Sequence, residues 1–238
     1  MTEVSFIIPT LNEEKYIESC LKSIRSQKTS LDFEIILSDS KSTDKTVEVA
    51  EKYVDKVIVP KRKGIATGRN MGAKAAKGKS LLFVDADTSI PPNYANVVHH
   101  VLLNEEIAGV CCAFKFDSND LFPKTVEKVT NNYLLIKGFQ SNSPFLGFDG
   151  SCRASTFKKV GGFPDKLLED RAFGLKLEKV GKVVYLPEPV VITSSRRLEQ
   201  QGPLGSINYY ADLQLFTDYN IPKTFKELFK YNKYKQIR

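Results

Sequence analysis

Apolar runs and amphipathic runs alternate along the first 85 residues of the chain. Short apolar runs occupy 4–8, 33–37, 56–59 and 81–84. Between them apolar residues recur every three or four positions, as at Ile17, Leu21 and Ile24. Short apolar runs are typical of buried strands, whereas a spacing of three or four is typical of a helix that buries one face. The pattern predicts alternating strands and helices, and hence a parallel sheet with right-handed crossovers.

Polar residues indicate where two of the predicted helices begin. Asn12 and Thr43 are candidate N-caps, because a short polar side chain can accept a hydrogen bond from the first helical turn. A further helix is predicted over 65–77 although it contains Gly68 and Gly72. Glycines at these positions would let the helix approach the sheet or a ligand closely.

The second half of the chain has a less regular pattern. Helices are predicted after Pro91 and Pro92, over 121–137 and near 169–180. Strands are predicted over 107–116, near 182–186 and near 189–193, with a Gly-rich loop over 147–151. The sequence therefore predicts an α/β fold, with one domain over 1–199 and a C-terminal helical extension over 200–238.

Polar residues follow three of the predicted strands. These groups are Pro9–Glu13, Asp39–Ser42 and Asp85–Asp87. Ligands of parallel sheets bind beyond the carboxyl ends of the strands. We therefore expect all three groups to lie around one cleft.

The segment Asp85-Ala86-Asp87 is the strongest chemical signal in this set. Two carboxylates two residues apart point to the same side of an extended chain. Carboxylate oxygens suit Mg²⁺ or Mn²⁺, which keep open positions for phosphate oxygens. The alternative is a solvated turn after a strand, where aspartate is common.

Five segments, taken together, resemble inverting family-2 glycosyltransferases, nucleotide-diphospho-sugar transferases of the GT-A fold. The resemblance implies a Rossmann-like, mostly parallel sheet flanked by helices, and it covers about residues 4–195. The segments stand in the family's order, which is more specific than any one match. They are SFIIPTLNEEKYIESCLKSI (5–24), EIILSDSKSTDKT (34–46), GIATGRNMGAKAAKGKSLLFVDADT (64–88), VGGFPDKLLED (160–170) and LEKVGKVVYLPEPVV (177–191).

The resemblance implies a nucleotide site and a metal site. Asp39 would read the edge of the base, although Asp39-Ser40-Lys41 lacks the second aspartate and the glycine usual in the family. Asp85 and Asp87 would hold Mg²⁺ or Mn²⁺ against the diphosphate. The full set of implied nucleotide-binding residues is Pro9, Leu11, Glu13, Asp39, Arg69, Asp85 and Ala86.

Glu169-Asp170 resembles the Glu-Asp pair of these enzymes, whose aspartate is the general base. An acceptor hydroxyl becomes a good nucleophile when a carboxylate takes its proton. Asp170 is the predicted base and Glu169 the second candidate, and attack opposite the leaving nucleotide would invert the anomeric centre. The alternative is that the two acids only stabilise a helix N-terminus.

Two further segments are candidates for substrate contacts. Arg196 and Arg197 follow the last predicted strand and suit a diphosphate, because guanidinium groups form forked hydrogen bonds. A solvated basic turn is an equal alternative. Asp149 and Gly150 lie where the family places an acceptor-side loop.

Charge and composition limit the partners and the compartment. The net charge of +7 and the pI of about 9.1 favour an anionic partner, such as a nucleotide diphosphate, an acidic polymer or an anionic membrane. The four cysteines lack metal-site spacing and are expected to be reduced thiols. The N-terminus does not resemble a signal peptide, and no apolar run is long enough to span a membrane. We expect a cytoplasmic protein, with peripheral membrane contact as an option.

The end of the chain carries lysines at helical spacing with apolar residues between them. The pattern over 222–238 predicts a basic amphipathic helix, formed around Lys223, Lys226, Lys230 and Lys233. Such a helix could lie on an anionic membrane. A terminal helix packed on the domain is the alternative.

The predicted function is therefore metal-dependent transfer of a sugar, with inversion, to an acceptor hydroxyl or a lipid phosphate. A sugar-nucleotide-forming nucleotidyltransferase is one alternative, but it would have a Gly-rich phosphate loop after the first strand, where this chain has Pro9-Thr10-Leu11-Asn12. A non-catalytic protein that binds a polyanion or a membrane surface is the other alternative. Nucleic acid is not an expected partner.

Overall fold

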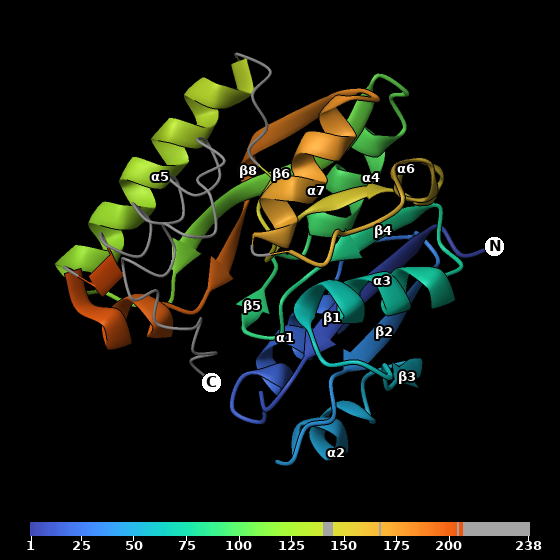
Figure 1. The fold of residues 1–238 in the computed structure, drawn as a ribbon, viewed down its shortest axis with the longest axis horizontal. Coiled ribbons are helices and arrows are strands. Elements are labelled where there is room, and N and C mark those ends of the chain that lie inside the picture. Colours follow the sequence, from blue (N-terminus) through green and yellow to red (C-terminus); the bar gives the residue numbers. More distant parts are fainter. Residues whose placement is uncertain (140–144, 167, 204, 207–238) are drawn as a thin grey trace, which may run out of the picture.

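An eight-stranded mixed sheet forms the centre of the computed structural model, which describes residues 1–139, 145–166, 168–203 and 205–206 (Figure 1). The strand order is β3-β2-β1-β4-β7-β6-β8-β5. The strands are β1 (Val4–Thr10), β2 (Phe33–Asp39), β3 (Lys56–Ile58), β4 (Ser80–Phe83), β5 (Thr88–Ser89), β6 (Ile107–Phe116), β7 (Ser151–Arg153) and β8 (Lys182–Thr193). The first four strands are parallel, as predicted.

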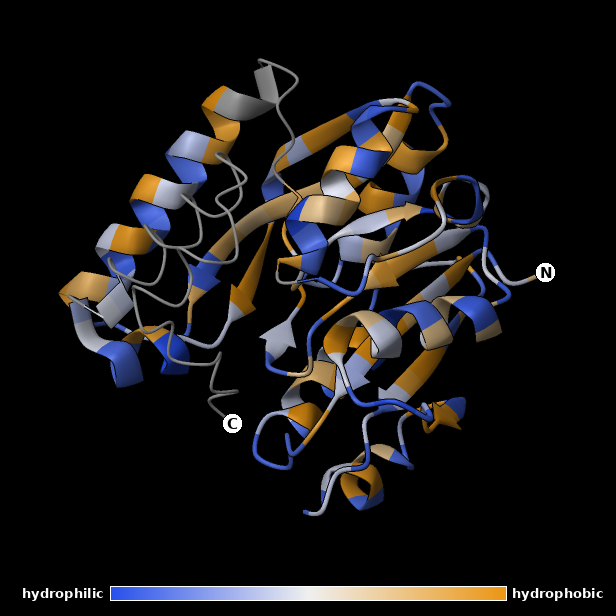
Figure 2. Cartoon of the chain, in the orientation of Figure 1, coloured by the Kyte–Doolittle hydropathy of each residue, from blue (hydrophilic) through white to orange (hydrophobic). Residues whose placement is uncertain are grey.

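Helices cover both faces of the sheet, so most strands are buried on two sides. They are α1 (Ile17–Arg25), α2 (Thr46–Ala50), α3 (Ile65–Ala75), α4 (Tyr94–Leu102), α5 (Leu121–Phe139), α6 (Ala154–Val160) and α7 (Glu169–Glu178). One apolar cluster joins the sheet to α1, α2 and α4, and a second joins it to α3, α6 and α7. Figure 2 shows apolar strands between helices whose polar and apolar residues alternate.

Glycines let α3 pack against the sheet at close range. A Cβ at Gly72 would lie 2.4 Å from Cγ2 of Ile7 in β1, and a Cβ at Gly68 would lie 3.4 Å from Cβ of Pro9. The expectation of close approach is confirmed. Because α3 lies this near to β1, its side chains reach the carboxyl ends of the strands.

The second half differs from the prediction in three short elements. The sequence pattern did not indicate β5, β7 or α6, because each is too short to carry a periodic signal. The two strands predicted near 182–186 and 189–193 are one strand, β8. β7 is antiparallel to both β4 and β6, so the sheet is mixed where the two halves meet.

The predicted N-caps are wrong. Asn12 has a positive φ of 57° and lies before α1, whose N-cap is Tyr16. The Asn12 side chain instead accepts a hydrogen bond from the backbone N–H of Thr43 (2.8 Å). Thr43 does not cap α2 either, since the Asp44 carboxylate accepts from the N–H of Thr46 (3.0 Å). The polar side chains tie two loops together instead of starting helices.

The C-terminal region is described only in part. Residues 196–203 are helical, whereas the basic segment predicted over 222–238 lies outside the described residues. Among the described helices, none combines the length and apolar character needed to cross a bilayer. The division into a domain over 1–199 and an extension over 200–238 stays a prediction.

Candidate active site

The loops that follow β1 and β2 lie side by side at the carboxyl edge of the sheet. Thr10 pairs with Asp39 at the ends of these strands, and the Ser40 N–H donates to the carbonyl of Thr10 (2.8 Å). The Glu13 N–H donates to the Thr46 hydroxyl (2.7 Å). The expected convergence of Pro9–Glu13 with Asp39–Ser42 is confirmed.

These two loops bury Pro9, Leu11 and Asp39 to different degrees. Pro9 is half-buried and Leu11 is 8% exposed. Asp39 is 2% exposed, and its carboxylate accepts from the Thr10 hydroxyl (3.1 Å) and the Ser42 N–H (2.8 Å). These bonds hold the carboxylate at the strand end, while contact with a base stays a prediction.

Asp85 and Asp87, the acid pair, lie in a turn that follows β4. The Thr88 N–H donates to the Asp85 carbonyl (3.0 Å), so the segment is not extended as the sequence argument assumed. Asp85 Oδ1 accepts a hydrogen bond from Arg69 (2.9 Å), and Asp87 Oδ2 forms an ion pair with Arg196 Nη2 (2.9 Å). The two carboxylates therefore hold different guanidinium groups, and the 3% exposed Ala86 lies between them.

Arg69 is a buried link between the acid pair and α7. Its side chain is 1% exposed and donates to Asp85 (2.9 Å), to Glu169 (2.7 Å) and to the carbonyl of Gly147 (2.7 Å). The guanidinium also lies 5.3 Å from the ring centroid of Phe163. Protein groups surround the Arg69 guanidinium in this structure. Its predicted contact with the nucleotide stays a prediction.

Glu169 and Asp170 begin α7 beside the same cluster. Burial raises the pKa of Glu169, and the charge of Arg69 opposes this only in part. Asp170 is half-buried, and its Oδ2 accepts from the N–H of Gly147 (3.2 Å). Gly147 thus contacts both Arg69 and Asp170, so α7 and the acid pair share one hydrogen-bond network.

Arg196 closes the opposite side of the acid pair. Its two terminal nitrogens donate to the two Glu13 oxygens (2.8 and 2.7 Å), and Nη2 also contacts Asp87. The guanidinium lies 4.6 Å from the ring centroid of Tyr16. Arg196 is therefore part of the cluster, whereas Arg197 is exposed.

Asp149 lies in the protein core. Its side chain is fully buried, Oδ2 accepts from the Cys112 N–H (2.6 Å), and its carbonyl accepts from the Tyr94 hydroxyl (2.8 Å). Burial raises the pKa of Asp149 well above its ordinary value. Gly150 is also buried, against Phe145. Both residues are buried in this structure, and their predicted contact with an acceptor stays a prediction.

Sequence reasoning missed Tyr16 and Gly147. A Cβ at Gly147 would lie 2.7 Å from an Arg69 nitrogen and 3.0 Å from Asp170 Oδ2, so the network requires glycine there. The Gly-rich loop was a visible signal, but nothing in the sequence connected it to Arg69. Tyr16 lies three residues after Glu13 at the N-cap of α1, and no pattern distinguished it from an ordinary surface tyrosine.

The donor set fits a hard divalent cation. Burial and the charge of Asp85 raise the pKa of Asp87 to about 7, against the effect of Arg196. Glu13 and Asp87 both lie close to Arg196 Nη2, at 2.7 and 2.9 Å, and with Asp85 their charges add to burial in raising the pKa of the nearby Cys20 thiol. The Arg196 guanidinium lies against the carboxylates of Glu13 and Asp87, so this position favours a positive charge. Within the described ranges no three His, Cys, Asp or Glu side chains form a complete metal site, so a cation would take one or two carboxylates and complete its shell with phosphate oxygens.

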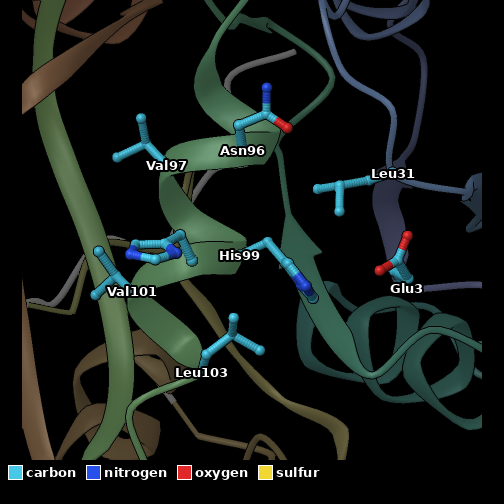
Figure 3. A pocket seen from close by; sticks show the side chains of 8 residues that line it. Glu3, Leu31, Asn96, Val97, His99, Val101 and Leu103 are labelled. Carbon is cyan, nitrogen blue, oxygen red and sulfur yellow. The ribbon is translucent and has the colours of Figure 1, made fainter.

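A separate pocket of about 620 Å³ lies at the other end of the strands (Figure 3). His99 extends from α4 toward Glu3 and Leu31 in this pocket, and its Nδ1 contacts the Ser80 hydroxyl (2.9 Å). Ser80 is the first residue of β4, whereas Asp85 follows its last. This pocket is therefore remote from the acid pair and is not part of the candidate site.

The glycosyl transferase family 2 model matches residues 5–160 of the chain. An uncharacterized glycosyltransferase of Haemophilus influenzae is 30% identical over 186 residues, which are 73% of this chain and 61% of that protein. The poly(ribitol-phosphate) beta-N-acetylglucosaminyltransferase TarS of Staphylococcus aureus is 37% identical over 97 residues, 38% of this chain and 17% of its own length. The chain spans less than two thirds of the length of each of these two relatives.

Solved structures share the fold at lower identity. The mannosyltransferase PcManGT of Pyrobaculum calidifontis, in complex with GDP-Man and Mn²⁺, aligns with a TM-score of 0.71 at 19% identity, covering 89% of this chain and 64% of that one. Glucosyl-3-phosphoglycerate synthase of Mycobacterium tuberculosis, with Mn²⁺ and UDP, aligns with a TM-score of 0.66 at 22% identity, covering 93% and 81%. The GT-A fold expected from the resemblance is confirmed. The match of the family model across most of the chain shows that this protein belongs to glycosyl transferase family 2.

Proposed function

We propose that the chain transfers a sugar from a nucleotide-diphosphate donor to an acceptor hydroxyl, with inversion and with Mg²⁺ or Mn²⁺. The observation that carries this proposal is the charged network at the strand ends, in which Arg69 joins Asp85 to Glu169 and Gly147 joins Arg69 to Asp170. A donor site and a base site are thereby held at a fixed separation. The nucleotide-bound and Mn²⁺-bound structures of similar fold support the same kind of donor.

The nucleotide would lie against the loops after β1 and β2. Pro9, Leu11 and Asp39 lie at these strand ends, and Glu13 holds Arg196. The Arg196 guanidinium would turn toward the diphosphate, because the phosphate groups of a diphosphate compete with carboxylates for its N–H donors. The similar structures carry UDP in one case and GDP-Man in another, so the base is left open.

Asp87, with Asp85, would hold the divalent cation. Such a cation, when bound, offsets charge on the diphosphate leaving group. Asp87 is 18% exposed beside Arg196, so the carboxylate can be reached from solvent. Arg69 holds Asp85 Oδ1 from the buried side, and the Asp85 side chain is 26% exposed.

Asp170 would take the proton of the acceptor hydroxyl. Among the described residues its Oδ2 accepts one hydrogen bond, from the N–H of Gly147 (3.2 Å), which leaves it able to accept another from an acceptor hydroxyl. Glu169 is held by Arg69 and fits a positioning role better than the role of base. A lipid phosphate acceptor is already ionised and would not need this base. A cytoplasmic location stays a prediction.

A thermal-shift panel tests the proposal directly. Nucleoside diphosphates and their sugars are added with and without Mn²⁺, and a specific donor should raise the unfolding midpoint only when Mn²⁺ is present. Asp170→Asn should keep that shift and reduce transfer by about a hundredfold or more. Asp165→Asn, an acid five residues earlier in the chain, is the matched control.

Two results would contradict the proposal. Unchanged turnover of Asp170→Asn would remove this residue from the mechanism. Release of pyrophosphate from a nucleoside triphosphate and a sugar phosphate would instead identify a nucleotidyltransferase.

A further inference from the structure

One side of α7 is directed toward α3 and the turn next to it. Glu169, Phe173 and Lys176 stand at positions i, i+4 and i+7, so their side chains lie on the same side of the helix. The helices α3 and α7 cover the same face of the sheet (Figure 1), where they share one apolar cluster. Asp170 follows Glu169 and points about 100° away from this side. Contacts on this side therefore determine where the Asp170 carboxylate lies.

The turn over 161–163, here called the Gly-Gly-Phe turn, receives two of these side chains. The ring of Phe173 stacks on the ring of Phe163, with the centroids 4.0 Å apart and an angle of 25° between the planes. The Lys176 ammonium donates to the carbonyl of Gly162 (2.7 Å). Phe163 and Phe173 are 3% and 0% exposed, so this contact is part of the core. The direction of α7 therefore depends on where the Gly-Gly-Phe turn lies.

Asn70 of α3 holds the Gly-Gly-Phe turn. Its side-chain amide donates to the carbonyl of Phe163 (2.8 Å), and its Oδ1 accepts from the N–H of the same residue (2.9 Å). Two hydrogen bonds of opposite direction fix both the position and the orientation of the backbone at Phe163. Gly162 makes this approach possible, because its φ is 65° and a Cβ there would lie 2.5 Å from Asn70 Oδ1.

Arg69 and Asn70 are consecutive residues of α3 and attach α7 at two points. Arg69 joins Asp85 at the strand end to Glu169 at the start of α7 (2.7 Å). Asn70 holds Phe163, which packs on α7 one helical turn later. A helix attached by one ion pair alone could pivot about it. The second attachment prevents this, so α3 sets the direction of α7 relative to Asp85.

We propose that Asn70 is a positioning residue for Asp170, because it holds α7 through the Gly-Gly-Phe turn so that the Asp170 carboxylate stays at a fixed distance from the acid pair. This inference rests on the proposed function, in which Asp170 takes the proton of the attacking hydroxyl while the bond between the sugar and the diphosphate breaks. A displacement of about 1 Å in such a group can lower the rate by about a hundredfold. Asn70 acts on Asp170 from a distance, so its loss should lower kcat without weakening donor binding.

Asn70→Ala removes both hydrogen bonds to Phe163 and tests the proposal. The probes are UDP-glucose, UDP-N-acetylglucosamine and GDP-mannose, each with Mn²⁺. Water takes the place of the acceptor hydroxyl, so turnover is measured as release of the nucleoside diphosphate. The substitution should lower kcat by about tenfold or more and leave KM for the donor within about twofold of the wild-type value.

Asn131→Ala is the matched control. Asn131 of α5 makes the same two hydrogen bonds to the backbone of Phe114 (2.8 and 3.1 Å), and it also accepts from the Tyr185 hydroxyl. Phe114 packs in the apolar cluster of α1, α2 and α4, whereas α7 packs in the other cluster. Asn131→Ala should therefore lower the unfolding midpoint at least as much as Asn70→Ala does, but keep the wild-type kcat. A loss of kcat confined to Asn70→Ala would then not be a general loss of stability.

Hydrogen exchange at Gly147, followed by NMR, reports on Asp170 without any turnover. The Gly147 N–H donates to Asp170 Oδ2 (3.2 Å), so it should exchange about tenfold faster in Asn70→Ala and at the wild-type rate in Asn131→Ala. Unchanged exchange in Asn70→Ala, or an equal loss of kcat in both variants, would overturn the positioning role. If wild type released no nucleoside diphosphate from any probe, the proposed function would fail, and the exchange rate of Gly147 alone would decide whether Asn70 positions Asp170.

Discussion

Arg69 is the residue on which the arrangement of the candidate site depends most. It is buried, carries a positive charge and joins Asp85 of the strand end to Glu169 of α7. A buried charge is tolerated only when it is paired and hydrogen-bonded, and each partner depends on the others. The structure shows that Arg69 is enclosed by protein groups, and its predicted contact with a nucleotide stays a prediction.

Replacing Arg69 tests this description. Arg69→Met should lower the free energy of unfolding by about 3–5 kcal/mol, because Asp85 and Glu169 lose their shared counter-charge. Urea denaturation measures the change. Lys182→Met is the matched control, since its ion pair with Glu106 is exposed and should contribute little. Equal effects of the two substitutions would contradict a special role for the buried network.

The buried carboxyl group of Asp149 predicts how the free energy of unfolding depends on pH. Burial raises the pKa of Asp149, so the folded protein keeps a proton that the unfolded chain loses above about pH 4. The contribution of Asp149 to the free energy of unfolding is therefore complete below that pH. As the pH rises, this contribution declines by up to about 1.4 kcal/mol per pH unit until the pKa of Asp149 in the folded protein is reached. Asp149→Asn, which mimics the protonated carboxyl, should remove this decline.

Urea denaturation at several values between about pH 4.5 and 7 compares wild type with Asp149→Asn. The difference in free energy of unfolding should shift in favour of the variant as the pH rises. A difference that does not change with pH would show that Asp149 is ionised in the folded protein.

At the scale of elements, the packing of α3 on β1 sets the position of Arg69. Gly72→Ala should destabilise the protein by about 1–3 kcal/mol, because the new Cβ would lie 2.4 Å from Cγ2 of the buried Ile7. Gly68→Ala is the matched control, since its Cβ would lie 3.4 Å from Pro9 and alanine favours a helix. Thermal unfolding of both variants measures the effect, and a stabilised Gly72→Ala would show that the helix can move away from the sheet.

At the scale of the whole molecule, Arg196 joins the last described segment to the first loop. It contacts Glu13, 183 residues earlier in the chain, and Asp87 after β4. Arg196→Met would leave these carboxylates close together without their cation. We expect Mn²⁺ to raise the unfolding midpoint of this variant more than that of wild type, because the ion then meets no competing charge.

Arg153→Met is the control for this experiment. Arg153 donates to the carbonyls of Leu102 and Asn104 at the end of α4 and does not touch the carboxylates. Its response to Mn²⁺ should match that of wild type. If Mn²⁺ stabilised Arg196→Met no more than wild type, the carboxylates would not form a cation site.

The sequence by itself determined the fold class and the side of the sheet on which the site lies. Strong apolar runs fixed β1, β2 and β4, and the parallel arrangement follows from the helices between them. The places of Asp39, Asp85 and Asp87 at strand ends follow in turn. These features are local or nearly local, so they can be read along the chain. The roles of these residues toward a nucleotide, together with Asp170 as base, remain predictions.

Only the tertiary structure decided which groups meet. Arg69 pairs with a residue 100 positions away, Arg196 with one 183 positions away, and Asp149 is enclosed by Cys112 and Tyr94. No periodicity along the chain encodes such contacts, because burial and charge pairing depend on neighbours that are brought together only when the sheet has formed.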